Sequence, residues 1–153
     1  MYTSFRVKIV PRPCACTSIK KLSRVLGRVY DAALATSPMN VTQLAILRCI
    51  DRSKGRSLAH VAEELEMDRS SLYRALDPMV RDGWVKTAAG TDARSLTAVI
   101  TYKGYRLLQK AGEQWEEVQT RVVERFGRHK WAAFVVELDR FRACAKTSEE
   151  DNL

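Results

Sequence analysis

The stretch that decides the fold is DRSSLYRALDPMVRDGWVKTAAGTDARSLTAVIT, residues 68–101. It opens with Asp68, a residue type that caps helices well, and apolar residues then recur at helical spacing. The predicted apolar ridge of this helix consists of Leu72, Leu76 and Val80. Pro78 lies inside the helix, and we expect it to bend the helix or to cost it one hydrogen bond.

After Gly83 the pattern changes from helix to strand. Segments 84–88 and 95–100 carry the apolar and β-branched residues that suit strands, and Gly90 and Asp92 lie between them. Turn residues between two such segments are typical of a β-hairpin. The sequence therefore predicts a hairpin directly behind the helix.

A shorter helix precedes Asp68. Ser57 can cap it, and its apolar face consists of Leu58, Val61, Ala62 and Leu65. Met67 and Asp68 leave room only for a tight turn before the next helix. Two short helices joined in this way form a helix-turn-helix candidate, and the hairpin behind them makes it a winged one.

Amphipathic helices flank this unit on both sides. They are predicted at 14–36, 41–52, 102–126 and 128–146, with Gly127 separating the last two. The apolar faces of the first and the last two helices are too broad for the central unit to cover. We therefore expect them to pack across a twofold axis in a homodimer, and the alternative is a monomer whose helices fold over its own core.

The predicted fold class is mainly α with a small β-hairpin wing, a winged helix-turn-helix with N- and C-terminal dimerisation helices. A chain of 153 residues suffices for one domain with its own core. We place this domain at 14–145, with the winged-helix unit at 37–101 and the dimerisation helices at 14–36 and 102–145. A basic extension at 1–13 precedes it, and a frayed tail at 146–153 follows.

Charge favours a polyanionic partner. The formal net charge is +8, and seven basic residues precede the first acidic residue, Asp31. No apolar run approaches the length of a membrane span, and the charged segment after Met1 does not resemble a signal peptide. We therefore expect a cytoplasmic protein with reduced thiols and no membrane partner.

Polar side chains at the start of the helix from Asp68 are the candidate DNA-binding residues Arg69, Ser70, Ser71, Tyr73 and Arg74. Hydroxyl groups and helix N–H groups bind phosphates, and arginine also reaches guanine in the major groove. A solvated helix face with a good cap accounts for these residues equally well. The hairpin favours DNA, because Asp92 can hold its tip while Arg94 projects toward a minor groove, with Lys86 as the other hairpin cation.

These motifs resemble the MarR family of winged-helix regulators. The resemblance rests on the D-x-R wing Asp92-Ala93-Arg94, on the following AVITYKGYRLLQKA, and on LAHVAEELEMDRSSLYRALDPMVRDGWV upstream, and it covers residues 14–145. It implies a dimeric transcriptional regulator, with the helix from Asp68 in the major groove of a double-stranded operator and Arg94 in the minor groove. The wing of this chain is less basic than is usual in the family.

The resemblance also implies release from DNA by a small aromatic or phenolic effector bound between the dimer helices and the DNA-binding unit. Candidate wall residues of that pocket are Tyr30, Leu34 and Trp115. The sequence thus predicts a repressor of a pseudo-palindromic operator. The alternative, favoured by the weakly basic wing, is a winged-helix dimer that acts as a ligand- or protein-binding module without operator binding.

Two cysteines are redox candidates on the same resemblance, because peroxide sensors of the family carry a reactive cysteine early in the first helix. Cys16 and Tyr30 resemble the cysteine and tyrosine of those sensors in spacing, and Cys144 could form a disulfide with Cys16 of the other subunit. The alternative is that these thiols fill a packing seam. Cys49 lies on the apolar side of its helix and is expected in the core.

Other classes of site find little support in the sequence. His60 and His129 stand apart without paired ligand spacing, and a C-x-C motif needs further ligands to hold a metal. Neither a nucleophile paired with a base nor a glycine-rich phosphate loop is present. We therefore expect neither an enzyme nor a bound metal or cofactor.

Overall fold

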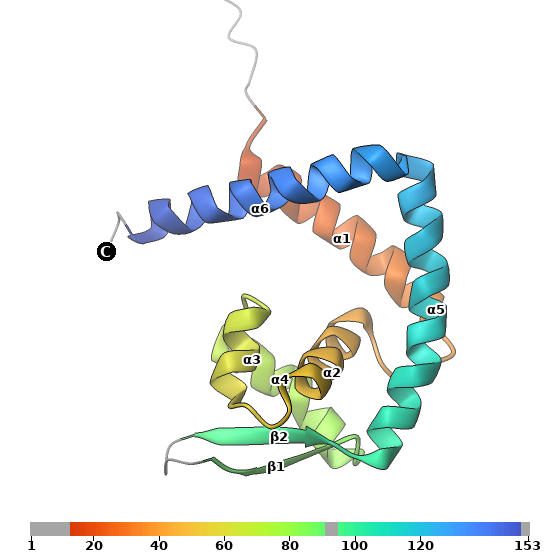
Figure 1. Cartoon of the computed structure of the whole chain (residues 1–153), viewed down its shortest axis with the longest axis vertical. Helices are drawn as coiled ribbons and strands as arrows, with labels where there is room; N and C mark the ends of the chain where they lie inside the picture. Colours follow the sequence, from red (N-terminus) through yellow and green to blue (C-terminus); the bar gives the residue numbers. More distant parts are fainter. Residues whose placement is uncertain (1–12, 91–94, 151–153) are drawn as a thin grey trace, which may run out of the picture.

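A computed structural model describes residues 13–90 and 95–150 of the chain, and Figure 1 shows the arrangement of its elements. The elements are α1 (Ala15–Ala33), α2 (Val41–Ser53), α3 (Leu58–Glu64), α4 (Arg69–Arg81), β1 (Val85–Ala89), β2 (Leu96–Ile100), α5 (Tyr102–Phe126) and α6 (Arg128–Glu150). The mainly helical fold with a two-stranded hairpin confirms the predicted fold class.

Side-chain caps fix where the helices of the winged-helix unit begin. Ser57, Asp68 and Thr101 each accept a hydrogen bond from the backbone N–H three residues later, which confirms the predicted caps at Ser57 and Asp68. Asn40 does the same at the start of α2, and the backbone N–H of Asn40 donates in turn to the side-chain oxygen of Gln43. This reciprocal capping box was not predicted from the sequence.

The core lies between α2, α3, α4, the hairpin and the first half of α5. Its fully buried large side chains include Leu44, Ile46, Leu47, Ile50, Leu58, Leu72, Leu76 and Met79. On α4 the prediction of Val80 as a core residue was wrong, because Val80 is 36% exposed while its neighbour Met79 is buried. Position 79 completes the same face as positions 72 and 76, since helical neighbours recur at every third or fourth residue.

The hairpin closes against the start of α5. Its strands pair antiparallel from Val85 with Ile100 to Ala89 with Leu96. Thr101 donates its backbone N–H to the carbonyl of Trp84 over 2.9 Å, and its hydroxyl donates to the carbonyl of Gly83 over 2.7 Å. These bonds set the angle at which α5 leaves the hairpin.

Helices α1 and α6 lie at the end of the molecule away from the hairpin, and α5 connects the two ends (Figure 1). Helix α1 contains no buried residue, and neither does the part of α6 whose burial is described, residues 128–148. Helix α1 ends at Ala33, earlier than the predicted 36, and α6 continues to Glu150 where a frayed tail was expected. Within the described residues, no helix is long and apolar enough to cross a membrane.

Candidate nucleic-acid interface

Asp68 organises the first turn of α4. Its carboxylate accepts hydrogen bonds from the Ser71 backbone N–H over 2.8 Å, from the Ser70 hydroxyl over 2.6 Å and from the Ser71 hydroxyl over 2.7 Å. The Ser70 hydroxyl bond, followed by the two bonds from Ser71, holds the pKa of the Asp68 carboxyl far below its usual range. Because both hydroxyl protons point to Asp68, Ser70 and Ser71 present oxygen lone pairs to solvent.

Two cations in the first half of α4 are free to reach outward. Arg69 and Arg74 are exposed, and among the described residues neither forms an ion pair. Tyr73 is 36% exposed beside them. Arg69 and Tyr73 line a hollow of about 280 Å³ together with Ser57 at the start of α3 and Leu96 on β2. The structure thus brings the start of α4 next to the end of the hairpin that carries its tip.

The tip itself lies outside the described residues. Asp92 and Arg94, predicted to form it, therefore have no structural description. The described part of the hairpin ends at Gly90, whose N–H donates to the carbonyl of Ser95 over 2.7 Å. Lys86 is exposed on β1, where it pairs with Val99 of β2.

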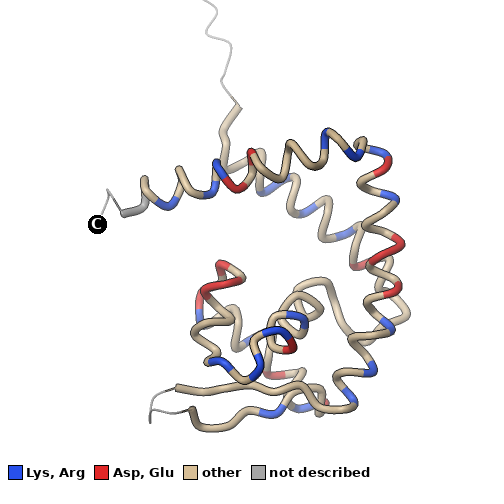
Figure 2. The backbone as a smooth tube through the Cα atoms, viewed as in Figure 1, with Lys and Arg blue, Asp and Glu red and all other residues tan. Residues whose placement is uncertain are grey.

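Charges are segregated around the winged-helix unit. Figure 2 shows acidic residues at the end of α3 that faces α6, on the side of this unit away from the hairpin. Glu63, Glu64 and Glu66 form this acidic end. Arg69, Arg74 and Arg81 are exposed on α4, and Lys86 is exposed on β1. A polyanion is therefore favoured on the α4 and hairpin side and disfavoured at the end of α3.

Two of the three predicted effector residues lie together. The rings of Tyr30 and Trp115 have centroids 6.4 Å apart, and both line an open groove of about 510 Å³ between α1 and α5. Burial raises the pKa of the Tyr30 phenol, and its hydroxyl donates a short hydrogen bond to Gln119. Leu34 does not line this groove, because it is 1% exposed and belongs to the core.

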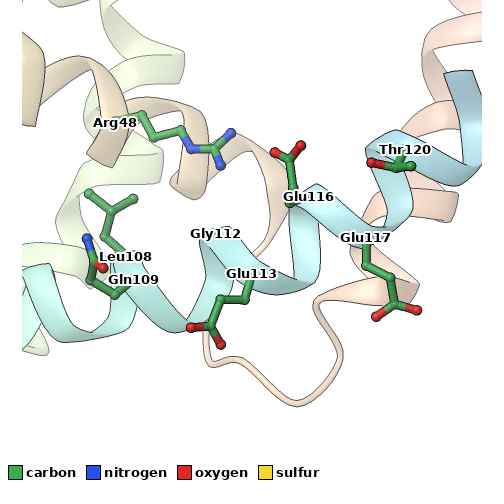
Figure 3. Close-up of a pocket in the computed structure, with 8 residues that line it drawn as sticks. All are labelled: Arg48, Leu108, Gln109, Gly112, Glu113, Glu116, Glu117 and Thr120. Atoms are coloured by element: carbon green, nitrogen blue, oxygen red, sulfur yellow. The ribbon is translucent and has the colours of Figure 1, made fainter.

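The guanidinium of Arg48 packs on an aromatic ring, a contact that was not predicted from the sequence. The guanidinium carbon lies 4.0 Å from the centroid of the Trp115 ring. Burial lowers the pKa of Arg48, whereas the nearby Glu116 raises it. Figure 3 shows Arg48 reaching from α2 toward Glu116 on α5, across an open groove of about 780 Å³. The contact joins positions far apart in the chain, so spacing within one helix could not reveal it.

The four cysteines are free thiols in different environments. Cys49 is buried, which confirms its assignment to the core, and burial followed by its hydrogen bond to Glu64 raises its pKa to about 11. Cys14, Cys16 and Cys144 are exposed. Hydrogen bonding by Thr17 lowers the pKa of Cys14, the cysteine that the sequence reading did not single out.

Comparison with known proteins agrees with this geometry. The sequence profile of the MarR family matches residues 37–95. The Mycobacterium tuberculosis transcriptional regulator MosR, crystallised in complex with DNA, is 34% identical over 86% of this chain and 98% of its own, with a TM-score of 0.74. No curated protein sequence matches the chain.

More distant structures share the fold. The transcriptional repressor CouR, bound to a 23-mer DNA duplex, is 21% identical over 84% of this chain and 92% of its own, with a TM-score of 0.76. The regulator PcaV from Streptomyces coelicolor, in complex with its natural ligand, is 19% identical over 88% of this chain and 99% of its own, with a TM-score of 0.73. The winged helix-turn-helix, the profile match and the identity to MosR together place this chain in the MarR family of transcription regulators.

Proposed function

We propose that the protein is a homodimeric repressor that binds a pseudo-palindromic operator. The observation that supports this proposal is that Arg69 and Arg74 are both exposed and that, among the described residues, neither forms an ion pair. They lie on a helix whose first turn is fixed by Asp68. A helix of this kind places its N-terminal side chains against base edges when it enters the major groove. MosR and CouR, which share the fold, were crystallised with DNA.

Each candidate residue has a proposed role. Arg74, in the second turn of α4, binds a guanine edge or a phosphate. Arg69 and Tyr73 contact the DNA phosphate backbone beside the hairpin. Ser70 and Ser71 act mainly through Asp68, because their hydroxyl protons are already donated to it. Lys86 contacts phosphate from β1. The roles of Asp92 and Arg94 at the wing tip rest on the family motif alone.

Dimerisation is proposed from the exposed apolar residues at the other end of the molecule. Large apolar side chains of α1 and α6 are exposed in the single chain, namely Ile19, Leu22, Val25, Val29, Val136 and Phe141. Those of α1 recur at helical spacing and form one stripe. A stripe of this kind is typical of a surface that another chain covers. The second copy would place two recognition helices for two half-sites.

An aromatic or phenolic effector is proposed for the groove beside Tyr30 and Trp115. Two aromatic rings and the apolar residues of α1 offer stacking and burial to such a ligand. PcaV, a fold relative, was crystallised with its natural ligand. Because Trp115 also carries the Arg48 guanidinium of α2, a ligand that moves this ring would disturb the winged-helix unit.

Oxidation of Cys16 is a second candidate for release, supported by its exposure near the start of α1. An organic hydroperoxide would oxidise the Cys16 thiolate to sulfenic acid and be reduced to its alcohol. The Cys144 thiol of the partner subunit would then attack the Cys16 sulfur, break its S–O bond and release water to give the disulfide. Non-reducing electrophoresis and DNA binding after treatment with an organic hydroperoxide test it. A Cys16→Ser variant that responds like the parent rules this route out.

Operator binding is tested by fluorescence anisotropy with DNA from upstream of the gene that encodes the chain. We expect Arg74→Ala and Arg94→Ala each to weaken binding by about 5- to 150-fold where they contact bases, equivalent to about 1–3 kcal/mol. Lys130→Ala, which removes one cation at the start of α6 far from the hairpin, should leave the affinity nearly unchanged.

Salt dependence separates this function from its alternative. Operator binding should weaken steeply as salt rises, because counterions are released from the phosphates that the protein contacts. If the protein does not bind the operator, or if its affinity for DNA changes neither with salt nor with the two arginine substitutions, a ligand- or protein-binding module that does not use DNA is favoured.

A further inference from the structure

Helix α6 reaches the winged-helix unit through one ion pair. The Nζ of Lys146 lies 2.6 Å from the Oε1 of Glu66, which belongs to the turn between α3 and α4. Figure 1 shows the last turns of α6 passing over α3. Among the described residues, no other ion pair joins α6 to this unit. The contact lies two residues before Asp68, the cap of the recognition helix.

The backbone around Glu66 is held in a defined turn at the end of α3. Glu66 has a φ of 51°, a left-handed conformation that a residue with a side chain keeps only where its surroundings hold it. Its N–H donates to the carbonyl of Glu63 over 3.2 Å, and the N–H of Met67 donates to the carbonyl of Ala62 over 2.9 Å. The residue that carries the ion pair is therefore fixed to the end of α3, two residues before the cap of α4.

The other end of the contact is equally well ordered. The hydroxyl of Thr147 donates to the carbonyl of Ala143 over 3.2 Å, and the hydroxyl of Ser148 donates to that of Cys144 over 3.0 Å. Both bonds lie within the helical turns that carry Lys146.

We propose that Lys146 and Glu66 form a positioning strut that sets the distance of the recognition helix from the dimerisation helices, and thereby the half-site spacing that the dimer accepts. The proposal rests on the proposed function, operator binding by a homodimer through α4. Without this pair, α4 is tied to the dimerisation helices through the packing of α1 and α5 on the winged-helix unit. The strut adds an attachment at the opposite end of the α3 and α4 pair, so the unit has less freedom to swing.

The size of the effect follows from exposure. The side chains of Lys146 and Glu66 are 53% and 42% exposed, so solvent screens their attraction. Exposed ion pairs change an equilibrium by about 1.4- to 5-fold each, and a dimer carries two struts. Loss of both should therefore weaken binding to the preferred operator by about 2- to 25-fold.

The test uses Lys146→Gln, Glu66→Gln and the double variant of the full chain. Two operators are compared by anisotropy, the preferred one and one whose half-sites are moved apart by one base pair. We expect both single variants to lose affinity for the preferred operator and part of the preference between the two spacings. The double variant should lose no more than either single one, because the interaction is already gone.

Controls separate the strut from plain charge effects. Glu66→Gln removes a negative charge, which by itself would strengthen binding of the protein to a polyanion, so weaker binding in this variant identifies the strut. Lys146→Arg should retain the parent affinity and spacing preference because it keeps the cation. Lys130→Gln removes a cation from the same helix and should leave the spacing preference intact.

Contrary outcomes are distinct. If the parent binds its operator but Lys146→Gln keeps the parent spacing preference, the strut is refuted. Losses that add in the double variant, or a lowered melting temperature with an unchanged spacing preference, would also refute it, since a purely structural role predicts these. A parent dimer that fails to bind DNA would overturn the proposed function and the strut with it.

Discussion

Two glycines on α5 should respond in opposite ways to the same substitution. Gly104 lies where α5 leaves the hairpin, and a Cβ added there would lie 2.1 Å from the carbonyl oxygen of Trp84. Gly112, two turns later, has space, because the nearest atom to an added Cβ is a guanidinium nitrogen of Arg48 at 3.9 Å. Both are helical positions, so alanine offers each the same gain in helix propensity.

The magnitude at Gly104 follows from the clash. A carbon and a carbonyl oxygen rarely approach within about 3.3 Å, so α5 and Trp84 would have to separate by about 1 Å. The Trp84 carbonyl also accepts the backbone N–H of Thr101 over 2.9 Å, and this shift would stretch that bond. Because the clash is with backbone atoms, the overpacking cost should lie in the upper part of the usual range, about 2–3 kcal/mol. A helix gain of about 1 kcal/mol then leaves a net destabilisation of about 1–2 kcal/mol.

Thermal unfolding measures this difference directly. At equal protein concentration, Gly104→Ala should lower Tm by about 2–8 °C, whereas Gly112→Ala should raise it by about 1–4 °C. Gly104→Ala should also weaken operator binding, because the joint that holds the hairpin against α5 moves. The same Tm for Gly104→Ala as for the parent, or equal shifts in both variants, would refute the reasoning.

Three further substitutions test the core, the buried thiol and the effector groove. Leu72→Ala should cost about 2–5 kcal/mol in urea unfolding, whereas Val80→Ala on the same helix should cost under about 1 kcal/mol, and similar costs would contradict the assigned core face. The pKa of Cys49 is raised to about 11 in the folded state, so the unfolded chain loses this thiol proton at lower pH than the folded chain. The contribution of the neutral thiol to folding stability is therefore complete below pH 9 and is lost as pH rises toward 11. Cys49→Ala should accordingly make Tm fall less steeply over that range. An unchanged slope would contradict this burial effect. Tyr30→Phe loses the hydrogen bond to Gln119 and should lower the free energy of unfolding by about 0.5–1.5 kcal/mol. A Tm equal to that of the parent would show that this bond does not stabilise the fold.

The sequence predicted the local structure of the winged-helix unit well, because its signals are local. The residue types of Ser57, Asp68 and Thr101 are typical of helix N-caps. The turn residues between the two strand segments are typical of a hairpin. Val80 shows the limit of such reasoning. Positions 79 and 80 both continue the ridge at helical spacing, and only the direction of the packing partner decides which of them is buried.

Contacts between distant helices could not be predicted from the sequence. Arg48 over Trp115, Tyr30 with Gln119 and the pairing of Lys146 with Glu66 each join elements whose separation is set by tertiary packing. Leu34 was assigned to the effector groove by its position in α1, but it follows the end of that helix and turns into the core.

Selection from a library of random DNA duplexes tests the central claim most directly. The purified protein is allowed to capture duplexes at moderate salt, and the retained sequences are compared with those retained by the Arg74→Ala variant. We predict enrichment of an inverted repeat whose half-site centres lie about one helical turn apart, or a multiple of it, and loss of that enrichment in the variant. Retained sequences without internal symmetry, or identical enrichment by both proteins, would contradict operator reading by α4 in a homodimer.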